Sequence, residues 1–356
     1  MINLFNKIKS FIIQKKRRVF AFFGLIIFLI YWLFCLPSSL FDNSKSTVLF
    51  AENGALLGAR ISDDGQWRFP HSDSVPYKFK MAILEFEDKE YYSQFGFSVK
   101  AFARAVKQNI DEGKIVSGGS TITMQTIRMS EQNSNRTFLT KFFETIKATR
   151  LEARLSKDEI LALYTSNAPM GGNVVGLDAA SWRYFGRSSS NLTWAEAATL
   201  AVLPNAPSLI HPGRNRSQLL NKRNRLLKKL YQSKVISKED FELAKEEGIP
   251  DKPLILPQLS SHLLQKISKA NQSKSTIDFD LQQKINQIVS YHNSELSKHE
   301  IHNLSAVVIN VETGDIEAYV GNSINANNQH NNYVDVASSS RSTGSILKPL
   351  LDRKSV

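Results

Sequence analysis

SGGSTITMQTIRM, residues 117–129, is the stretch of sequence on which the predicted fold depends. Two glycines, Ser120 and Thr121 come directly before a pattern typical of a helix. The segment therefore predicts a turn that presents backbone N–H groups to an anion at a helix N-terminus. Arg128 and Gln125, further along the same helix, add a cationic group and a neutral hydrogen-bond donor. An ordinary Gly-Gly-Ser helix start would have the same appearance, so the stretch has to be read with its neighbours.

Acidic residues gather upstream, in LEFEDKEYYSQFGF at residues 84–97. Glu87 and Asp88 stand there with other carboxylates among aromatic side chains. Carboxyl groups held among aromatic rings are expected to have raised pKa values, because desolvation disfavours the charged form. A glutamate of this kind can serve as a general base or acid near neutral pH. A helix end with a solvated acidic face is the structural alternative.

Downstream, TKFFETIKATRLEARLSKDEILALY at residues 140–164 predicts helices that carry Lys141 and Glu144 three positions apart. Residues at this spacing are neighbours on a helix, and a surface ion pair is the usual explanation. Taken with the upstream segments, however, the chain supplies two glutamates, cationic groups and an anion-binding turn. A reaction that activates a hydroxyl while it releases a phosphate needs these parts.

The N-terminal residues predict a membrane segment. The chain has 45 Lys and Arg against 33 Asp and Glu, a net charge of +12 that favours anionic partners. Residues 1–18 are predicted to be a basic cytoplasmic tail, and the charge-free residues 19–36 a single transmembrane helix of about 27 Å. The basic flank predicts that the rest of the chain is translocated. A cleaved signal peptide is the alternative.

A mostly helical domain is predicted over residues 45–235. It begins with a β-hairpin signal in residues 47–61, where apolar runs flank an Asn-Gly pair. Residues 156–159 and 193–196 both have the Ser/Thr-x-x-Glu form of a capping box, and each opens an apolar segment.

A second domain is predicted after a linker. Proline and polar residues mark residues 236–275 as the linker, and residues 276–356 then change to an α/β pattern in which two β-rich runs are joined by a Thr-Gly turn. The single cysteine, Cys35, excludes a disulfide within the chain and a thiolate metal site. No segment is typical of a nucleic-acid-binding module.

Five segments occur in a characteristic order: EDKEYYSQFG, GGSTITMQ, the helix with Lys141 and Glu144, SKDEILALY, and the NKRNRLLKKL region around Arg223. In these residues the chain resembles the membrane-anchored peptidoglycan glycosyltransferases that form the first domain of class A penicillin-binding proteins. Stretches such as NAPMGGNVVGLDAASWRYFGRS resemble the penicillin-binding protein 1C subgroup. The resemblance implies a mainly α, lysozyme-like glycosyltransferase domain after one transmembrane helix, followed by an incomplete α/β penicillin-binding transpeptidase domain. It also implies a place in the bacterial inner membrane, with the catalytic domain on the periplasmic side.

The resemblance further implies a lipid-linked reaction, in which the growing glycan on undecaprenyl pyrophosphate is the donor and lipid II is the acceptor. By position, Glu87 is the general base that deprotonates the acceptor hydroxyl, and Glu144 is a second glutamate near the departing pyrophosphate. Asp88 is counted with the catalytic carboxylates. The implied substrate-binding residues are Ser120, Thr121, Gln125, Arg128 and Lys141.

The implied partners are lipid II, the growing glycan chain, the membrane and other cell-wall synthesis proteins, but no nucleic acid. A divalent cation, Mg²⁺ or Mn²⁺, is expected to help neutralise the pyrophosphate, and no organic cofactor is expected. The sequence does not identify the residues that would bind this metal.

The sequence departs from the family pattern at four places. Gln94 replaces a histidine, Tyr91 a phenylalanine, Thr140 an arginine, and Thr165-Ser166 a Leu-Asn pair. Neither candidate catalytic glutamate is lost, so we expect an active enzyme. A lysozyme-like hydrolase is the alternative among enzymes, because two glutamates also suit hydrolysis. An inactive membrane-anchored scaffold that binds lipid II or divisome proteins is the alternative from another class.

The C-terminal residues predict part of a second active site. RSTGSILK holds Ser345 and Lys348 three positions apart and, with the preceding strands, resembles the start of a penicillin-binding transpeptidase domain. There the serine would be acylated and the lysine would activate it. That fold also needs a Ser-x-Asn element and a Lys-Thr-Gly strand, and neither follows residue 348. We therefore expect a truncated, non-functional transpeptidase remnant.

Overall fold

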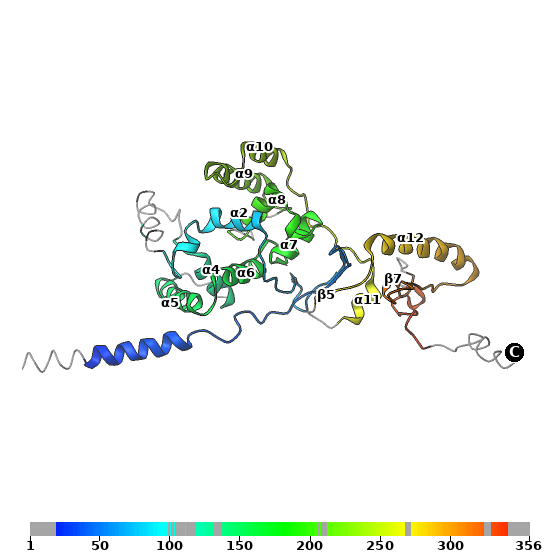
Figure 1. The fold of residues 1–356 in the computed structure, drawn as a ribbon, viewed down its shortest axis with the longest axis horizontal. Helices are drawn as coiled ribbons and strands as arrows, with labels where there is room; N and C mark the ends of the chain where they lie inside the picture. The colour runs from blue at the N-terminus through cyan, green and yellow to red at the C-terminus, as the bar shows by residue number, and fades with distance from the viewer. Residues whose placement is uncertain are drawn as a thin grey trace, which may run out of the picture. The chain divides into compact units, whose positions relative to one another are not determined.

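The chain folds into two compact units (Figure 1). The computed structural model describes residues 19–98, 100, 103, 111, 119–131, 137–205, 207, 212–267, 272–323 and 329–340. The first unit comprises Met1–Asn43, His71–Phe185 and Ser189–Pro253, and the second comprises Ser44–Pro70, Gly186–Ser188 and Leu254–Val356. Ser345 and Lys348 lie outside the described residues, so the predicted transpeptidase site stays a prediction.

The first unit is mainly helical, as the sequence predicts. Helix α4 packs against α5 and α6, and α8 packs against both α2 and α9. Buried alanines line α8 and allow this close approach. The elements run in the order α2 (Tyr77–Glu87), η1 (Tyr91–Ser93), α4 (Ile122–Ser130), α5 (Phe138–Arg154), α6 (Lys157–Asn167), β4 (Val174–Val175), α7 (Leu177–Phe185), η2 (Ser189–Asn191), α8 (Trp194–Ala201), α9 (Arg216–Gln232) and α10 (Lys238–Glu246).

Both predicted capping boxes are confirmed. Ser156 and Glu159 exchange side-chain and backbone hydrogen bonds at the start of α6, and Thr193 and Glu196 do the same at the start of α8. Each box satisfies backbone N–H groups that a helix otherwise leaves unpaired at its N-terminus. The sequence pattern therefore fixes where these two helices begin.

Two further caps begin the helices that carry most of the predicted site. The Thr121 hydroxyl accepts a hydrogen bond from Met124 N at 3.2 Å and so begins α4. Thr137 and Thr140 form a capping box at the start of α5. Thr140 stands where the resemblance predicts an arginine, and it has a structural role here.

The predicted transmembrane helix at residues 19–36 is not supported by the structure. Among the described residues, no helix is long and apolar enough to cross a membrane. The described residues of this segment are helical up to residue 34. The last turn is attached to α5: Trp32 Nε1 donates to Thr149 Oγ1 at 3.0 Å, and Arg150 Nε donates to the Leu33 carbonyl at 3.2 Å.

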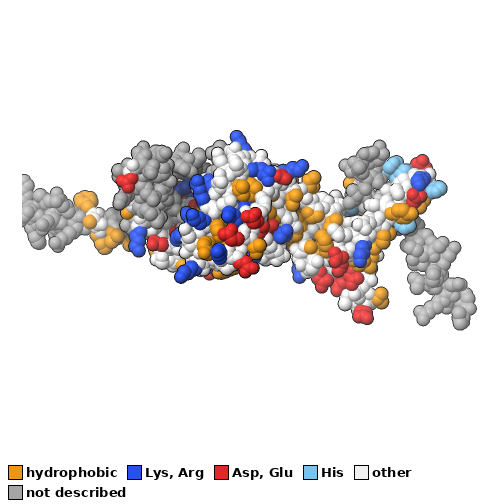
Figure 2. All heavy atoms as spheres, turned by 90° about the horizontal axis from the view of Figure 1, so that it is seen from above, with side chains coloured by type: hydrophobic (Ala, Val, Ile, Leu, Met, Phe, Trp, Pro, Cys, Tyr) orange, Lys and Arg blue, Asp and Glu red, His pale blue; other side chains and the backbone are white. Residues whose placement is uncertain are grey.

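Helix α9 contains the basic NKRNRLLKKL segment. One residue of this segment, Arg223, is buried rather than exposed. Lys and Arg side chains are spread over the face of the first unit that Figure 2 shows, in keeping with the net charge. Arg223, however, is fully buried and donates to the carbonyls of Lys245 at 3.1 Å and Glu247 at 2.5 Å. A cation suits the C-terminal carbonyls of a helix. Arg223 therefore fastens the end of α10 to α9.

The second unit contains two small sheets. Strand β1 (Thr47–Phe50) pairs antiparallel with β2 (Leu56–Arg60) and parallel with β5 (Gln272–Lys274), and β6 (Ala306–Ile309) pairs antiparallel with β7 (Ile316–Val320). The predicted hairpin and the later pair of β-runs are thus confirmed. Leu49, Leu57, Leu264, Ile277 and Tyr319 form part of one core cluster. The other elements are β3 (Trp67–Arg68), α11 (Ser261–Lys266), α12 (Phe279–Leu296), η3 (Ser297–His299) and η4 (Gln329–Asn331).

The units differ from the predicted domain boundaries. Residues 45–70, the predicted start of the glycosyltransferase domain, fall in the second unit, because β1 pairs with β5 more than 200 residues later. Helix α10 falls in the predicted linker, yet it belongs to the first unit and packs on α8 and α9.

Candidate functional site

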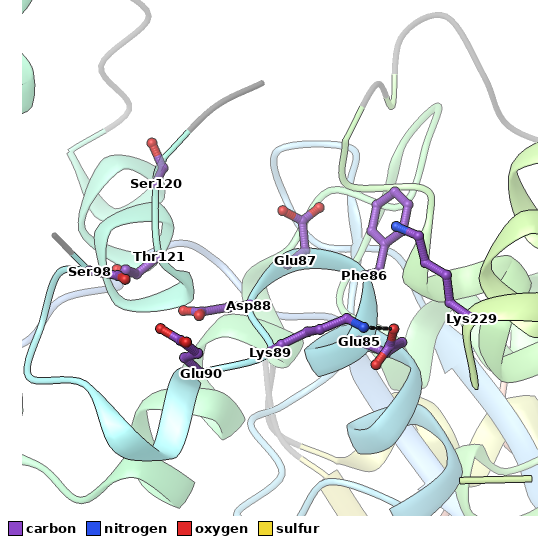
Figure 3. A pocket seen from close by; sticks show the side chains of 10 residues that line it. All are labelled: Glu85, Phe86, Glu87, Asp88, Lys89, Glu90, Ser98, Ser120, Thr121 and Lys229. Atoms are coloured by element: carbon purple, nitrogen blue, oxygen red, sulfur yellow. Dashed lines mark ion pairs between the residues drawn. The ribbon is translucent and has the colours of Figure 1, made fainter. Parts of the chain in front are cut away.

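A pocket of about 200 Å³ lies at the C-terminal end of α2 (Figure 3). Glu87 is the last residue of α2, and Asp88 ends the helix with its backbone N–H on the Leu84 carbonyl. Ser120 and Thr121, at the start of α4, line the same pocket. The remaining lining residues are Glu85, Phe86, Lys89, Glu90, Ser98 and Lys229. The structure thus brings the upstream carboxylates and the start of the GGST segment together.

Glu87 is held in one orientation from the side of α4. Gln125 Nε2 donates to Glu87 Oε2 at 2.8 Å, and the Tyr164 hydroxyl donates to Gln125 Oε1 at 3.5 Å. Burial raises the pKa of Glu87, and the negative charge of Asp88 adds to this, whereas the Gln125 hydrogen bond and Lys222 oppose it. A carboxylate with a raised pKa is a better proton acceptor near neutral pH. The residue has the properties predicted from its aromatic neighbours.

Asp88 faces the N-terminus of α4. Its Oδ2 accepts hydrogen bonds from Ile122 N at 3.2 Å and from Gln94 Nε2 at 2.5 Å. Burial raises the pKa of Asp88, and both hydrogen bonds oppose the rise. Gln94, at the position where the resemblance predicts a histidine, therefore donates to the carboxylate of this turn.

The second predicted carboxylate binds a cation on the neighbouring helix. Arg128 Nε and Nη2 donate to the two oxygens of Glu144 at 2.8 and 2.7 Å, and Nη2 also donates to Ser120 Oγ at 3.3 Å. The Glu144 side chain is only 5% exposed, so this is a nearly buried bidentate pair. The predicted Lys141–Glu144 spacing therefore describes neighbours, but the partner that holds Glu144 comes from α4.

Lys141 and Thr121 have more specific surroundings than the sequence suggests. Burial lowers the pKa of Lys141, and the nearby Arg128 lowers it further. The Thr121 hydroxyl accepts from Met124 N and donates to the Gly96 carbonyl at 2.7 Å. That hydroxyl is already used within the fold, and the predicted contact of Thr121 with substrate stays a prediction.

Some residues near Glu87 were missed by the sequence analysis. Lys229 lines the pocket, and the positive charge of Lys222 lowers the pKa of Glu87. Both lie in or next to the basic segment of α9, which the sequence analysis used only for its resemblance. Ser166 is not among the residues that line the pocket. Its hydroxyl lies 3.0 Å from His71 Nδ1.

The expected divalent cation has no ready-made set of protein ligands among the described residues. None of their His, Cys, Asp and Glu side chains form a group of three or more that could hold one. The site carboxylates are already engaged, Glu87 by Gln125, Asp88 by Ile122 N–H and Glu144 by Arg128. The expected Mg²⁺ or Mn²⁺ stays a prediction.

Comparison with known proteins identifies the family. The Transglycosylase family model matches residues 54–231, half of the chain. Penicillin-binding protein 1C of Escherichia coli is 34% identical over 88% of this chain and 41% of its own length, and penicillin-binding protein 1A of Pseudomonas aeruginosa is 34% identical over 56% and 24%. A crystal structure of penicillin-binding protein 1A from Haemophilus influenzae matches with 18% identity and a TM-score of 0.33, over 77% of this chain and 33% of that one. The chain spans less than half the length of these relatives. Through the matched family model, this chain belongs to the transglycosylase family.

Proposed function

We propose that this chain is a peptidoglycan glycosyltransferase, which polymerises lipid II into β-1,4-linked glycan and releases undecaprenyl pyrophosphate. The observation that carries the proposal is the placement of Glu87 at a pocket, where its carboxylate has a raised pKa and is held by Gln125. Gln125 lies on α4, the helix that also provides Arg128. A proton acceptor and a cationic group are thus fixed by one rigid element. Membership of the transglycosylase family supports the reaction class.

Glu87 acts as the general base in this reaction. Its ionised carboxylate accepts the proton of the acceptor's 4-hydroxyl while that oxygen forms a bond to the anomeric carbon of the donor. The bond from this carbon to the pyrophosphate oxygen breaks, and its electron pair leaves with the pyrophosphate. Attack on the face opposite the leaving group converts an α-linked donor into a β-1,4 bond. Glu87 then releases the proton to water.

The leaving pyrophosphate is stabilised by the cationic cluster of Arg128 and Lys141. Glu144 fixes the guanidinium of Arg128 with two hydrogen bonds but also compensates its charge. Lys141 therefore supplies the net positive charge of this cluster. Burial and Arg128 make the Lys141 ammonium less stable in the free protein, so an incoming anion gains a stronger interaction there. Because both substrates carry a polyprenyl chain, the proposed reaction takes place at a membrane surface.

Polymerisation of labelled lipid II by the detergent-solubilised chain tests the proposal. We expect glycan and free polyprenyl pyrophosphate from the parent chain and a loss of at least about a hundredfold in Glu87→Gln, the size typical of a general base. Glu239→Gln, an exposed position on α10, is the matched control and should keep full activity. Glycan cleavage without pyrophosphate would identify a hydrolase. A folded parent chain that binds lipid II but makes no glycan would identify a scaffold.

The predicted acylation of Ser345 needs a separate measurement. A fluorescent penicillin that fails to label Ser345 in an active polymerising chain would agree with a non-functional second domain. Labelling that disappears in Ser345→Ala would instead show that this serine is still acylated.

A further inference from the structure

A buried ion pair lies behind the turn that carries Glu87 and Asp88. Lys157 Nζ lies 2.6 Å from Glu152 Oε1, and the Thr123 hydroxyl donates to the same oxygen at 2.6 Å. The side chains of Glu152 and Lys157 are 3% and 19% exposed. The pair therefore joins the end of α5 and the start of α6 to α4, the helix of Gln125 and Arg128. Among the described residues, no group donates to the buried Glu152 Oε2.

Tyr91 connects this pair to the catalytic turn. The Tyr91 hydroxyl donates to the Lys157 carbonyl at 2.7 Å, and the Lys157 ammonium lies 4.5 Å from the centre of the Tyr91 ring. Tyr91 is fully buried and begins η1, three residues after Asp88. Phenylalanine, which the resemblance predicts at this position, has no hydroxyl to make this hydrogen bond, so the connection depends on the tyrosine.

The charges of the pair also act on Asp88. Burial is the main cause of the raised Asp88 pKa, and among the nearby charges Lys157 lowers it while Glu152 raises it. Glu87, Lys89 and Glu90 are the other charged groups of the same turn. On the far side of Tyr91, the Asp158 carboxylate is held by Lys80 at 2.8 Å and by the Tyr92 hydroxyl at 2.6 Å.

We propose that Glu152 and Lys157 are positioning residues for the Glu87–Asp88 turn, acting through Tyr91 and through the balance of their opposite charges. The proposal rests on the glycosyltransferase function, since it assigns the pair to the site of that reaction. It differs from a merely structural role in one respect: the two members should change the ionisation of Asp88 in opposite directions.

The pH dependence of kcat/KM tests this difference in the full chain. The proposed reaction needs both carboxyls of the turn ionised: Glu87 as the base, and Asp88 as the acceptor of the Ile122 and Gln94 hydrogen bonds that hold the turn. Loss of the cation in Lys157→Met should move the acid limb to higher pH, and loss of the anion in Glu152→Gln should move it to lower pH. Each shift should reach about half a pH unit or more for charges this close in a poorly solvated site. The double variant, which removes both charges, should return the acid limb close to that of the parent chain. Lys157→Arg keeps the cation and should therefore leave the acid limb at the parent position.

Lys80→Met is the matched control, because it removes a cation of the neighbouring Asp158 cluster and should leave the acid limb in place. Tyr91→Phe should lower kcat by several-fold without moving the limb, since it removes the connecting hydroxyl but no charge. Equal losses of activity in Lys157→Met and Glu152→Gln with an unmoved limb would overturn the proposal and leave a structural pair.

A second readout separates this proposal from the proposed function. The carboxyl carbon of Asp88 can be titrated by NMR in a chain labelled at aspartate, with Asp88→Asn to assign the signal. Opposite shifts of this titration in the two variants, in a chain that makes no glycan, would uphold the charge balance and reject only the function. An Asp88 titration that is the same in the parent and both variants would reject the inference, whatever the activity.

Discussion

Gln125 controls how far the Glu87 carboxyl can act as a base. Its hydrogen bond opposes the rise in pKa that burial causes, so Gln125→Leu should raise the pKa of Glu87 further. A general base works only when ionised, and a raised pKa means that activity falls earlier as the pH decreases. We therefore expect the acid limb of kcat/KM to move to higher pH, with a larger loss at low pH than at high pH. Gln218→Leu, an exposed position on α9, should show the parent profile; an unmoved limb in Gln125→Leu would contradict the assignment of Glu87.

The Arg128–Glu144 pair should respond unequally to the loss of either partner. Arg128→Gln leaves a glutamate that is 5% exposed without its cation, and we expect a loss of about 3 kcal/mol in the free energy of unfolding. Glu144→Gln leaves an arginine that is 27% exposed and can turn toward water, so a loss of about 1 kcal/mol is expected. Urea unfolding of both variants measures the difference. Equal costs would show that Glu144 reaches solvent as easily as Arg128 does.

The residue types of the site could be predicted from the sequence, but their partners could not. The crowding of Glu87 by aromatic residues indicated a raised pKa, and the structure agrees. Helical spacing suggested Lys141 as the partner of Glu144, whereas Arg128, sixteen residues away on another helix, holds it. Periodicity describes neighbours on one helix and carries no information about which side chain of a packed helix lies opposite.

At the level of elements, the turn that follows η1 is fixed against α5 by a glycine. Gly96 has φ +75°, and a Cβ there would lie 2.7 Å from Thr149 N and 2.9 Å from the Ala148 carbonyl carbon. Gly54, in the hairpin turn, has φ +82° but open space around a Cβ. Gly54→Ala should therefore cost about 1 kcal/mol from backbone strain alone, and Gly96→Ala at least about 2 kcal/mol more, because backbone atoms must move. Thermal unfolding compares them, and similar costs would show that α5 can shift.

Helix starts were predicted where the sequence carries a complete signal. The boxes at Ser156 and Thr193 both end in glutamate and could be read directly. The box at Thr137 uses Thr140 as its second member, which the glutamate pattern does not include. The same physical need, unpaired N–H groups at a helix start, is thus met by a residue that the usual pattern misses.

At the level of the whole chain, the composition change near residue 276 indicated a second domain. The compact unit that contains these residues also includes Ser44–Pro70, much earlier in the sequence. Strand β1 and the residues of its hairpin are near the first unit in sequence, and only their pairing with β5 and their packing on Leu264 and Tyr319 join them to the second. Contacts between residues so far apart leave no local pattern. A hairpin is also marginally stable by itself and needs such partners.

Removal of residues 254–356 tests this dependence. The deletion takes away β5 and the part of the core cluster that covers Leu49, Ala51 and Leu57. Without that cover, the apolar face of β1 and β2 is exposed and one edge of β1 loses its hydrogen bonds. We expect amide hydrogen exchange in β1 and β2 to accelerate at least about a hundredfold, since local stability falls when buried contacts are lost. The buried amides of α8 serve as the internal reference. Protection of the hairpin that survives the deletion would mean that residues 44–70 fold with the helical unit after all.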